Sequence, residues 1–287
     1  MKKLFIYIYR ICVEHLSRKG LEKYIPIISV VERLFAYFLK KDFVEIKGHK
    51  MFLDRKDSLR LSIKKVYEPL ETEIVENEVK PGDFVLDIGA NIGYFTLIFA
   101  RLVGDNGKVF AFEPEPITFK LLEKNIQINN YKNVILEQKA VSDKRGKLKL
   151  YISEENNGDH RIYESVEKRN SIEIESVYID GYLSNQYINK IKFIKMDIQG
   201  AEGLAIQGMK KLLETNEKIK LLTEFAPCSL KICGTDPKEF LEILLKLGFK
   251  LYYTDYKNKK VKPVNINYLL KEYNVRSDDW TTLFCIR

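Results

Sequence analysis

The sequence has few of the side chains that form metal clusters and disulfide frameworks. It contains three histidines and four cysteines in 287 residues, and no two cysteines form a CxxC pair. A histidine-based zinc site and a disulfide scaffold are therefore not expected, and unpaired thiols are typical of a reduced, cytoplasmic protein. With 45% hydrophobic and 31% charged residues, the composition indicates a packed globular protein rather than a disordered one.

Long uncharged hydrophobic runs are also missing. The two most apolar stretches, residues 4–16 and 26–39, are each interrupted by charged side chains. Neither reaches the roughly 18 apolar residues that identify a membrane-spanning helix. We expect residues 1–50 to form an amphipathic helical segment, separate from a main domain at residues 51–287. Two roles stay open for this segment: packing on the main domain, or peripheral contact of residues 1–40 with an anionic membrane surface.

The excess of positive charge is confined to that N-terminal segment. Residues 1–50 hold 11 of the 48 Lys and Arg and 5 of the 40 Asp and Glu, which leaves 37 basic and 35 acidic residues for the rest. The main domain is therefore nearly neutral. Because nucleic-acid binding needs a basic face on the working domain, the formal net charge of +8 does not predict a nucleic-acid partner.

Strand-like and helical segments alternate along the main domain. After an alternating stretch at 43–54 and a helical region at 56–80, apolar runs begin at residues 84, 108, 133, 192 and 220. Most of these runs are followed by a helical pattern, which predicts an α/β sandwich with a largely parallel sheet. Residues 146–153 and 171–180 are interpreted as an inserted strand pair. No long helix separates the last two runs, 249–255 and 281–287, so the final strand is expected to be antiparallel.

The most informative segment is a turn with the sequence DIGANIG at residues 87–93, between a predicted strand and a predicted helix. In α/β folds a nucleotide-type ligand lies across such a turn, where Gly89 lets the ligand approach and Gly93 lets the helix pack closely. The dinucleotide fingerprint GxGxxG is missing, since Asn91 and Tyr94 stand where it requires glycine. No GxxxxGK[ST] motif exists either, which excludes an ATP-type phosphate loop.

Two acidic residues indicate which ligand this turn holds. Glu113 ends the next predicted strand, about 20 residues after the turn, where a carboxylate accepts hydrogen bonds from ribose hydroxyls. Asp87 heads the turn and favours a ligand with positive charge over one with phosphates. A nucleoside with an α-amino group and a sulfonium meets both requirements, so the pattern predicts S-adenosylmethionine as the cofactor.

Five stretches resemble the FkbM family of class I, S-adenosylmethionine-dependent methyltransferases. They are VKPGDFVLDIGANIGYFTLIFA, VFAFEPEP, AVSD, FIKMDIQGAE and TEFAPCSLKICGTDPKEFL, and the resemblance runs from residue 67 to 254. The IKxDxxGAE element and the later E-x-x-P…G…P segment are the most specific of them. The family implies a Rossmann-like, seven-stranded, mostly parallel sheet with an antiparallel last strand. It also implies O-methylation of a hydroxyl on a glycan, glycolipid or small metabolite.

The resemblance also assigns cofactor contacts by position. Glu113 and the adjoining Pro114 are expected beside the ribose, and Ala140 and Ser142 of AVSD beside the adenine. One departure from the family is Gln199, where many relatives carry Glu. The residues expected along the methionine part of the cofactor are Asp87, Gly89, Ala90, Asn91, Gly93, Phe95 and Asp197.

Four side chains are candidates for the chemistry at a hydroxyl acceptor. Asp197 ends the fourth parallel strand, which faces the transferred methyl group in this fold class, and Glu202 begins the next helix. A carboxylate there can accept the hydroxyl proton or orient the acceptor. His160, in the polar loop of the inserted pair, is a candidate general base. Glu224, at the end of the fifth strand, is a candidate for binding the acceptor.

Structural alternatives stay open for these candidates. The helix dipole explains Glu202 as a first-turn residue, His160 can be a solvated loop histidine, and Glu224 can be a satisfied strand-end carboxylate. Asp197, Glu202 and Glu224 together are also oxygen ligands of the kind that Mg²⁺ prefers, but their spacing does not require a metal, and none is predicted. Trp280 is expected to serve in packing. In YEPLET at 67–72, Glu71 either closes over the cofactor or simply belongs to a helix start.

Two other functions compete with O-methylation. Methyltransferases that act on base nitrogens usually carry an (N/D)PP(Y/F) motif at the fourth strand, and residues 197–200 read DIQG instead. A non-catalytic module that binds S-adenosylmethionine or docks to a membrane is the third reading. The intact cofactor and acceptor motifs favour the O-methyltransferase.

Overall fold

The computed structural model describes residues 43–164, 168–276 and 279–287. The chain divides into two compact units between Tyr67 and Glu68. The helical segment predicted for residues 1–50 lies almost entirely outside the described residues, so its structure and its boundary stay predictions. Within the described ranges, no helix is long and apolar enough to cross a membrane.

The described part of the first unit is a short hairpin followed by one helical turn. The antiparallel strands are β1 (Val44–Ile46) and β2 (His49–Met51), and the helix is α3 (Leu61–Lys64). The turn between the strands contains Gly48, whose φ of 85° favours glycine. The strand pair predicted from the alternation at 43–54 is therefore confirmed.

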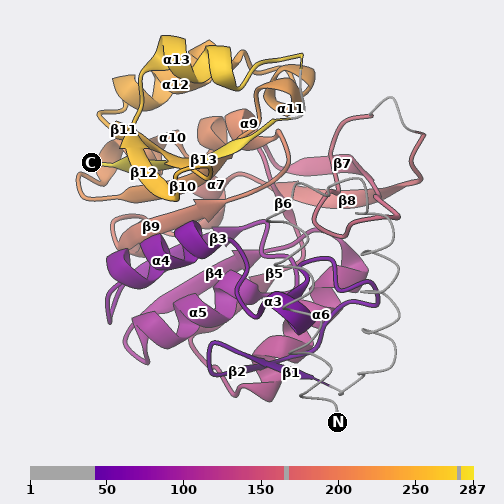
Figure 1. Ribbon diagram of the computed structural model, residues 1–287. Helices are drawn as coiled ribbons and strands as arrows, with labels where there is room; N and C mark the ends of the chain where they lie inside the picture. The colour runs from indigo at the N-terminus through magenta and orange to yellow at the C-terminus, as the bar shows by residue number, and fades with distance from the viewer. Residues whose placement is uncertain (1–42, 165–167, 277–278) are drawn as a thin grey trace. The chain divides into compact units, whose positions relative to one another are not determined.

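The second unit is built on an eight-stranded sheet with the order β12-β11-β13-β10-β9-β3-β4-β5 (Figure 1). The five strands from β10 to β5 are parallel, and β13 runs antiparallel between β10 and β11. The predicted parallel sheet with an antiparallel last strand is confirmed, and β12 is an additional, exposed edge strand. The strands are β3 (Phe84–Ile88), β4 (Lys108–Phe112), β5 (Val134–Glu137), β9 (Ile191–Met196), β10 (Lys220–Phe225), β11 (Lys250–Asp255), β12 (Lys260–Pro263) and β13 (Thr281–Ile286).

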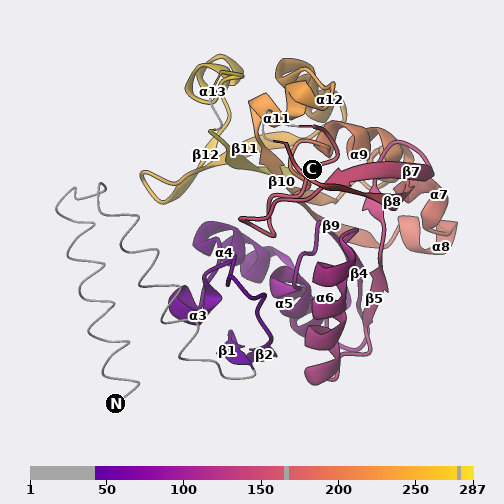
Figure 2. The same ribbon diagram turned by 90° about the vertical axis from the view of Figure 1, so that its right-hand side faces the viewer.

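Helices cover both faces of this sheet (Figures 1 and 2). The helical region predicted at 56–80 is two helices, and the second begins at Pro69, because proline fits the first turn of a helix but not its interior. The helices of the second unit are α4 (Pro69–Glu78), α5 (Tyr94–Val103), α6 (Pro116–Ile128), α7 (Ile179–Tyr182), α8 (Asn185–Ile188), α9 (Glu202–Gly208), α10 (Lys210–Thr215), α11 (Pro227–Ile232), α12 (Pro237–Lys246) and α13 (Ile266–Glu272).

A second, three-stranded sheet contains the inserted strand pair. Strand β7 (Gly146–Tyr151) pairs antiparallel with β8 (Ser171–Val177), as predicted, and β8 also pairs in parallel with β6 (Ala140–Val141). The apolar run at 133–141, predicted as one strand, is thus two. Its first part belongs to the main sheet and its second part, beyond Gln138 and Lys139, to the small one.

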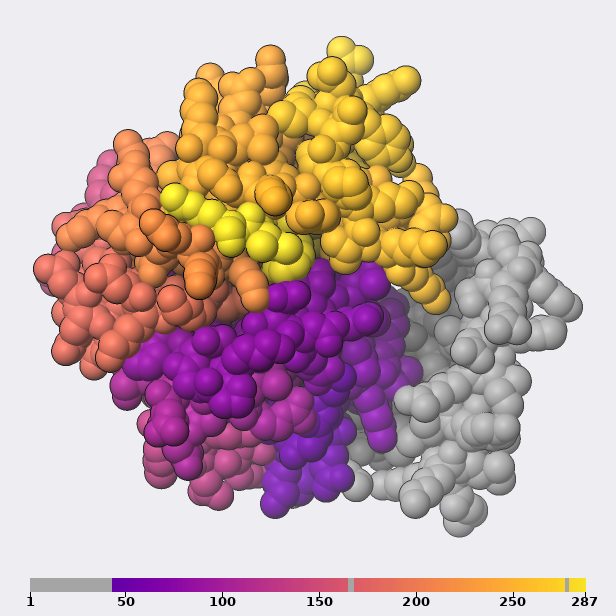
Figure 3. All heavy atoms as spheres, turned by 90° about the vertical axis from the view of Figure 1, so that its left-hand side faces the viewer, coloured from indigo at the N-terminus to yellow at the C-terminus, as the bar shows by residue number. Residues whose placement is uncertain are grey.

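The centre of the main sheet is mostly apolar, and two buried charged residues stand out in it. Strand β3 is buried at all five positions, as expected for a parallel strand covered by helices on both faces. Asp87 in β3 and Lys195 in β9 are the charged exceptions, and they lie opposite each other in the parallel register. The last strand, β13, lies between segments from distant parts of the chain (Figure 3). Asp87, Lys195 and the first residues of β13 all lie toward the carboxyl ends of β3, β9 and β10.

Candidate active site

The glycine turn after β3 is held tightly against two neighbouring strands. The backbone N–H groups of Gly89 and Ala90 both donate to the carbonyl oxygen of Phe112, at 3.0 and 2.9 Å. Gly89 has a φ of +80°, and a Cβ atom there would lie 2.0 Å from the backbone oxygen of Asp197. No residue other than glycine fits this position without moving the segment that carries Asp197.

Asparagine replaces the second fingerprint glycine because it tolerates the same backbone conformation. Asn91 has a φ of 50°, in the left-handed region that asparagine adopts more readily than most residues. The helix start is then fixed from α6, where the side-chain amide of Asn125 donates to the Ile92 carbonyl oxygen at 2.7 Å. A Cβ at Gly93 would lie 2.6 Å from Leu122 of α6, in agreement with the close helix packing expected of that glycine.

Glu113 at the end of β4 is tied to the glycine turn. Its two carboxylate oxygens accept hydrogen bonds from the backbone N–H groups of Asn91 and Glu115, both at 2.9 Å. Burial raises the pKa of Glu113 to about 7, although these hydrogen bonds act in the opposite direction. Each oxygen keeps a further lone pair for a ligand hydroxyl.

One carboxylate oxygen of Asp87 has no hydrogen-bond partner among the described residues. Its side chain is 1% exposed, and Oδ2 accepts a hydrogen bond from the Thr96 hydroxyl at 2.6 Å. Oδ1 is buried and has no hydrogen-bond partner within the described part of the chain. Burial raises the pKa of Asp87, and the nearby charge of Lys195 opposes that rise. An unsatisfied carboxylate oxygen at the head of the turn fits the cationic end of S-adenosylmethionine.

Lys195 is a site residue that the sequence-based reasoning missed. Its ammonium lies 3.6 Å from Oδ2 of Asp197 and 4.7 Å from the centre of the Phe95 ring. Burial by itself lowers the pKa of Lys195, but the carboxylates around it, Asp197 foremost, raise it above the usual value. A lysine between Ile194 and Met196 in an apolar strand was the available signal.

A pocket opens beyond Asp197 and brings together two of the four predicted catalytic residues, Asp197 and Glu224. The side-chain amide of Gln199 joins them, since Nε2 donates to Oδ1 of Asp197 at 2.8 Å and approaches both oxygens of Glu224 at 3.3 and 3.4 Å. Burial raises the pKa of Glu224 well above its usual value, and the charge of Asp197 raises it further. The residue that departs from the family therefore bridges two carboxylates that would otherwise only repel.

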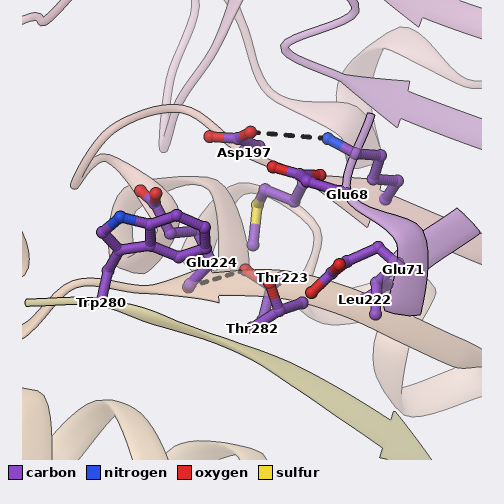
Figure 4. A pocket seen from close by; sticks show the side chains of 10 residues that line it. Glu68, Glu71, Asp197, Leu222, Thr223, Glu224, Trp280 and Thr282 are labelled. Carbon is purple, nitrogen blue, oxygen red and sulfur yellow. Dashed lines mark hydrogen bonds and ion pairs between the residues drawn. The ribbon is translucent and has the colours of Figure 1, made fainter. Parts of the chain in front are cut away.

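The other walls of the pocket come from distant segments (Figure 4). Glu68 and Glu71 come from the start of α4, and Trp280 and Thr282 from the start of β13. Trp280 packs edge-to-face against Tyr256, as expected, and it also lines the pocket with 41% of its surface exposed. Glu71 lines this pocket and also lies in the first turn of α4, so both interpretations of YEPLET stay open.

The structure places Glu202 and His160 away from this pocket. Both oxygens of Glu202 accept backbone N–H groups of the preceding turn, from Ile198 at 3.0 Å and Gly200 at 2.9 Å, and the side chain is fully buried. Burial raises the pKa of Glu202 to about 7. The Nδ1 atom of His160 accepts the N–H of Ser153 at 3.1 Å, and burial lowers the pKa of the ring.

The remaining predicted cofactor residues lie around the turn and the small sheet. The loop with His160 reaches the turn, where the Asn91 amide donates to the Asn157 carbonyl at 3.3 Å. Pro114 is half-buried beside Glu113, and Phe95 is buried under Lys195. Ala140 packs in the apolar cluster of the small sheet.

Ser142, the other residue expected beside the adenine, is buried at the end of β6. Its hydroxyl donates to the carboxylate of Asp143 at 3.0 Å, and its N–H to the Val177 carbonyl at 2.8 Å. Over the ranges that the structure describes, no group of three or more His, Cys, Asp or Glu side chains is arranged to hold a metal ion.

Comparison with known families agrees with this geometry. The Methyltransferase FkbM domain matches residues 87–251, which is more than half of the chain. The chain belongs to the FkbM methyltransferase family. It is therefore a methyltransferase whose methyl donor is S-adenosylmethionine, as the glycine turn and Glu113 predict.

Curated relatives of this FkbM-family chain come from a fungus, a bacterium and an archaeon. Methyltransferase 1 of Beauveria bassiana is 25% identical over 170 residues, which are 49% of this chain and 68% of that protein. The 31-O-demethyl-FK506 methyltransferase FkbM of Streptomyces tacrolimicus is 44% identical over 69 residues, 24% of this chain and 26% of that protein. The hexuronic acid methyltransferase AglP of Haloferax volcanii is 25% identical over 220 residues, 76% of this chain and 80% of that protein.

Proposed function

We propose that the chain is an O-methyltransferase that transfers a methyl group to a hydroxyl of a glycan, a glycolipid or a small metabolite. The observation that carries the proposal is the position of Asp197. It lies at the end of β9, its backbone oxygen touches the glycine turn, and its side chain is 24% exposed in the wall of the pocket. It thus stands between the cofactor turn and the space for an acceptor.

The cofactor side is assigned to residues that fit its chemistry. The unsatisfied oxygen of Asp87 suits the cationic amino-acid end, and the carboxylate of Glu113 suits the ribose hydroxyls. When bound, S-adenosylmethionine would supply a methyl group on a sulfonium, and transfer to the acceptor oxygen would leave the electrons of the carbon–sulfur bond on sulfur. The protein's part is to hold the acceptor in line and to take the hydroxyl proton.

We assign the proton-accepting role to Asp197. Lys195 at 3.6 Å and Gln199 at 2.8 Å hold its two carboxylate oxygens in place. Glu224 lies on the far side of Gln199, where it can bind the acceptor. His160 lies on the cofactor side and Glu202 holds the turn after β9, so neither has a part in this proton transfer.

Two relatives support the choice of a hydroxyl acceptor. By their names, the Streptomyces relative methylates an oxygen of a small metabolite, and the Haloferax relative methylates a sugar acid. The Haloferax relative is only 25% identical to this chain. Its sugar-acid acceptor therefore supports a sugar hydroxyl as the acceptor here, but it does not indicate that the sugar is acidic.

Transfer from tritiated S-adenosylmethionine into an extract of the source cells tests the proposal. We expect label in a nuclease-resistant glycan, lipid or small-molecule fraction, and we expect Asp197→Asn to lower the rate by about 10²- to 10⁴-fold. Label that disappears on nuclease treatment would instead favour a nucleic-acid methyltransferase. An Asp197→Asn variant with the wild-type rate would remove Asp197 from the mechanism.

Calorimetry with S-adenosylhomocysteine tests the cofactor site separately. Asp87→Ala and Glu113→Ala are each expected to weaken binding about tenfold or more, because each removes a protein carboxylate that accepts hydrogen bonds from the ligand. Unchanged affinity in both variants would mean that the cofactor is held elsewhere.

The expected cytoplasmic location and the membrane contact of residues 1–40 are the last parts of the proposal. The membrane contact is supported by the basic N-terminal segment, with 11 Lys and Arg against 5 Asp and Glu in residues 1–50. The cytoplasmic location is supported by the four cysteines, which form no CxxC pair. Cosedimentation of the full chain with vesicles of anionic lipid tests the contact. Equal sedimentation with neutral and anionic vesicles would contradict it.

A further inference from the structure

The pocket beyond Asp197 is rich in hydrogen-bond acceptors and poor in donors. Its described donors are the ammonium of Lys195, which is already next to Asp197, the indole N–H of Trp280 and the hydroxyls of two threonines, Thr223 and Thr282. The acceptor oxygens of four carboxylates outnumber these donors, so a ligand that completes the pocket is expected to bring donors of its own. The carboxylates that line the pocket are Glu68, Glu71, Asp197 and Glu224.

Glu71 shows most directly that a donor is missing. Its side chain is 1% exposed, and Oε1 accepts a hydrogen bond from the hydroxyl of Tyr256 at 2.5 Å. Oε2 is buried and has no hydrogen-bond partner within the described ranges. A buried carboxylate oxygen without a donor destabilises the folded chain, so a ligand donor there would be favourable. Figure 4 shows this carboxylate directed toward Thr282 and the interior of the pocket.

Glu224, near the end of β10, has only weak hydrogen-bond partners among the described side chains. Its side-chain contacts with Gln199 are long, at 3.3 and 3.4 Å, and it stands directly opposite Thr282 in the register of β10 and β13. Glu224 and Glu71 thus offer acceptor oxygens on two sides of one space. This arrangement suits a ligand with several hydroxyl groups around a ring.

Trp280 supplies an apolar wall to the same space. Its indole is 41% exposed and is held edge-to-face against Tyr256, with ring centres 5.3 Å apart. In Figure 4 the indole lies on the other side of the pocket from Glu71. A rigid aromatic face beside hydrogen-bond acceptors matches a ring with an apolar face and a polar edge.

We propose that this pocket binds the methyl acceptor and selects a polyhydroxylated ring that carries no anionic group beside the reacting hydroxyl, with Glu71 as a specificity-determining residue. The inference rests on the proposed function and narrows its acceptor. Burial disfavours the charged form of Glu224, and Lys195 offsets one negative charge. The repulsion of an acidic substituent therefore comes from Glu68, Glu71 and Asp197. The cofactor contacts Asp87, Gly89 and Glu113 do not line this pocket.

The first experiment asks whether the pocket belongs to the acceptor or to the cofactor. Calorimetry compares the affinity of the full chain for S-adenosylhomocysteine in wild type, Glu71→Gln and the matched control Glu73→Gln, which is exposed on the same helix. We expect all three affinities to agree within about threefold. A loss of tenfold or more in Glu71→Gln alone would assign Glu71 to the cofactor and overturn the proposal.

The second experiment measures the charge preference directly. Methyl β-D-glucoside, methyl β-D-glucosaminide and methyl β-D-glucuronide are titrated onto the full chain saturated with S-adenosylhomocysteine, and binding is followed by saturation-transfer NMR. We expect the first two to bind at least about tenfold more tightly than the glucuronide. Glu71→Gln removes one charge and should narrow that ratio to about threefold.

Trp280→Ala serves as a second variant that changes an exposed residue. It should lower the affinity for all three sugars by a similar factor without changing the order of the affinities, because it removes the aromatic wall but no charge. Equal or tighter binding of the glucuronide, or no binding of any of the three sugars, overturns the proposal. If the wild-type chain does not bind S-adenosylhomocysteine at all, the proposed function itself is contradicted.

Discussion

The glycine turn and the pocket beyond Asp197 share one aspartate but satisfy their polar groups differently. On the side of the turn, Glu113 accepts two backbone N–H groups at 2.9 Å, and Glu202 in the neighbouring turn after β9 accepts two at 3.0 and 2.9 Å. On the side of the pocket, Oε2 of Glu71 has no partner among the described residues, and Glu224 has only long contacts with a side-chain amide. Backbone groups therefore satisfy most of the turn and leave Oδ1 of Asp87 for the ligand, whereas the pocket leaves two carboxylates short of donors.

This difference explains why one family can keep its cofactor and change its acceptor. Backbone contacts in the turn cannot be altered without altering the backbone itself. The pocket is lined by side chains from α4, β9, β10 and β13, and each can be replaced while the sheet remains. Variants on the two sides of Asp197 should accordingly differ in kind, with losses of stability on one side and changes of specificity or pH dependence on the other.

The largest effect is expected from Gly89→Ala. The new Cβ would lie 2.0 Å from the Asp197 backbone oxygen, at a φ of +80°. We expect the free energy of unfolding to fall by about 4 kcal/mol, measured by denaturant titration. Gly82→Ala is the control, since Gly82 has a φ of +88° but no atom within 4 Å of the new Cβ, and should lose about 1 kcal/mol. Equal losses would show that backbone conformation, not the close approach, decides.

The next effect concerns the pH dependence of stability on the side of the turn. The carboxyl of Glu113 has a pKa of about 7 in the folded chain against 4.5 for the free group. Its contribution to stability is thus fully present below about pH 4.5 and is lost as the pH rises through 7. Relative to Glu113→Gln, the wild-type chain should lose about 3 kcal/mol between pH 4.5 and pH 8, measured by denaturant titrations at both. Parallel pH profiles would contradict the buried, protonated carboxyl.

On the side of the pocket, Lys195→Met should move the pH profile of methyl transfer. The ammonium lowers the pKa values of Asp87 and Glu224, and the other groups facing it, Asp197 and Glu68, are also acidic. Removal of this charge raises those pKa values, so we expect the acidic limb of the rate profile to move about one to two units higher.

The control for Lys195→Met is Lys192→Met, an exposed position on the same strand. It should leave the profile of transfer into the labelled extract fraction unchanged. A lower rate with an unmoved profile for Lys195→Met would mean that the lysine acts only in packing against Phe95.

The smallest effect is expected from Gln199→Glu, which introduces the residue that the family resemblance predicts at this position. It exchanges the amide that bridges Asp197 and Glu224 for a third carboxylate, and should raise the pKa of Glu224 further. We expect the acidic limb to move by about half a unit to one unit, with unchanged affinity for S-adenosylhomocysteine. Gln207→Glu on the exposed side of α9 should do neither. A shift of the acidic limb to lower pH would contradict the role of the Gln199 amide as a donor to Asp197 and Glu224.

Local sequence determined the sheet and the cofactor turn. The alternation of apolar runs with helical patterns predicts the parallel strands, and the DIGANIG turn with Glu113 predicts the cofactor, because each depends on the periodicity or the backbone conformation of a continuous segment. The positive φ of Asn91, in contrast, is a finding of the structure, because the sequence showed only that a fingerprint glycine is missing there.

Only the tertiary structure decided which charged groups act together. Asp87 and Lys195 are 108 positions apart and meet because β3 and β9 are adjacent in register. Glu71, Glu224 and Trp280 face one space because α4, β10 and the start of β13 converge. Glu202, only five residues after Asp197 in sequence, faces its own turn instead. The physical reason is that a charge's burial, partners and pKa depend on neighbours in space. Those neighbours are set by strand order and register, which no local pattern contains.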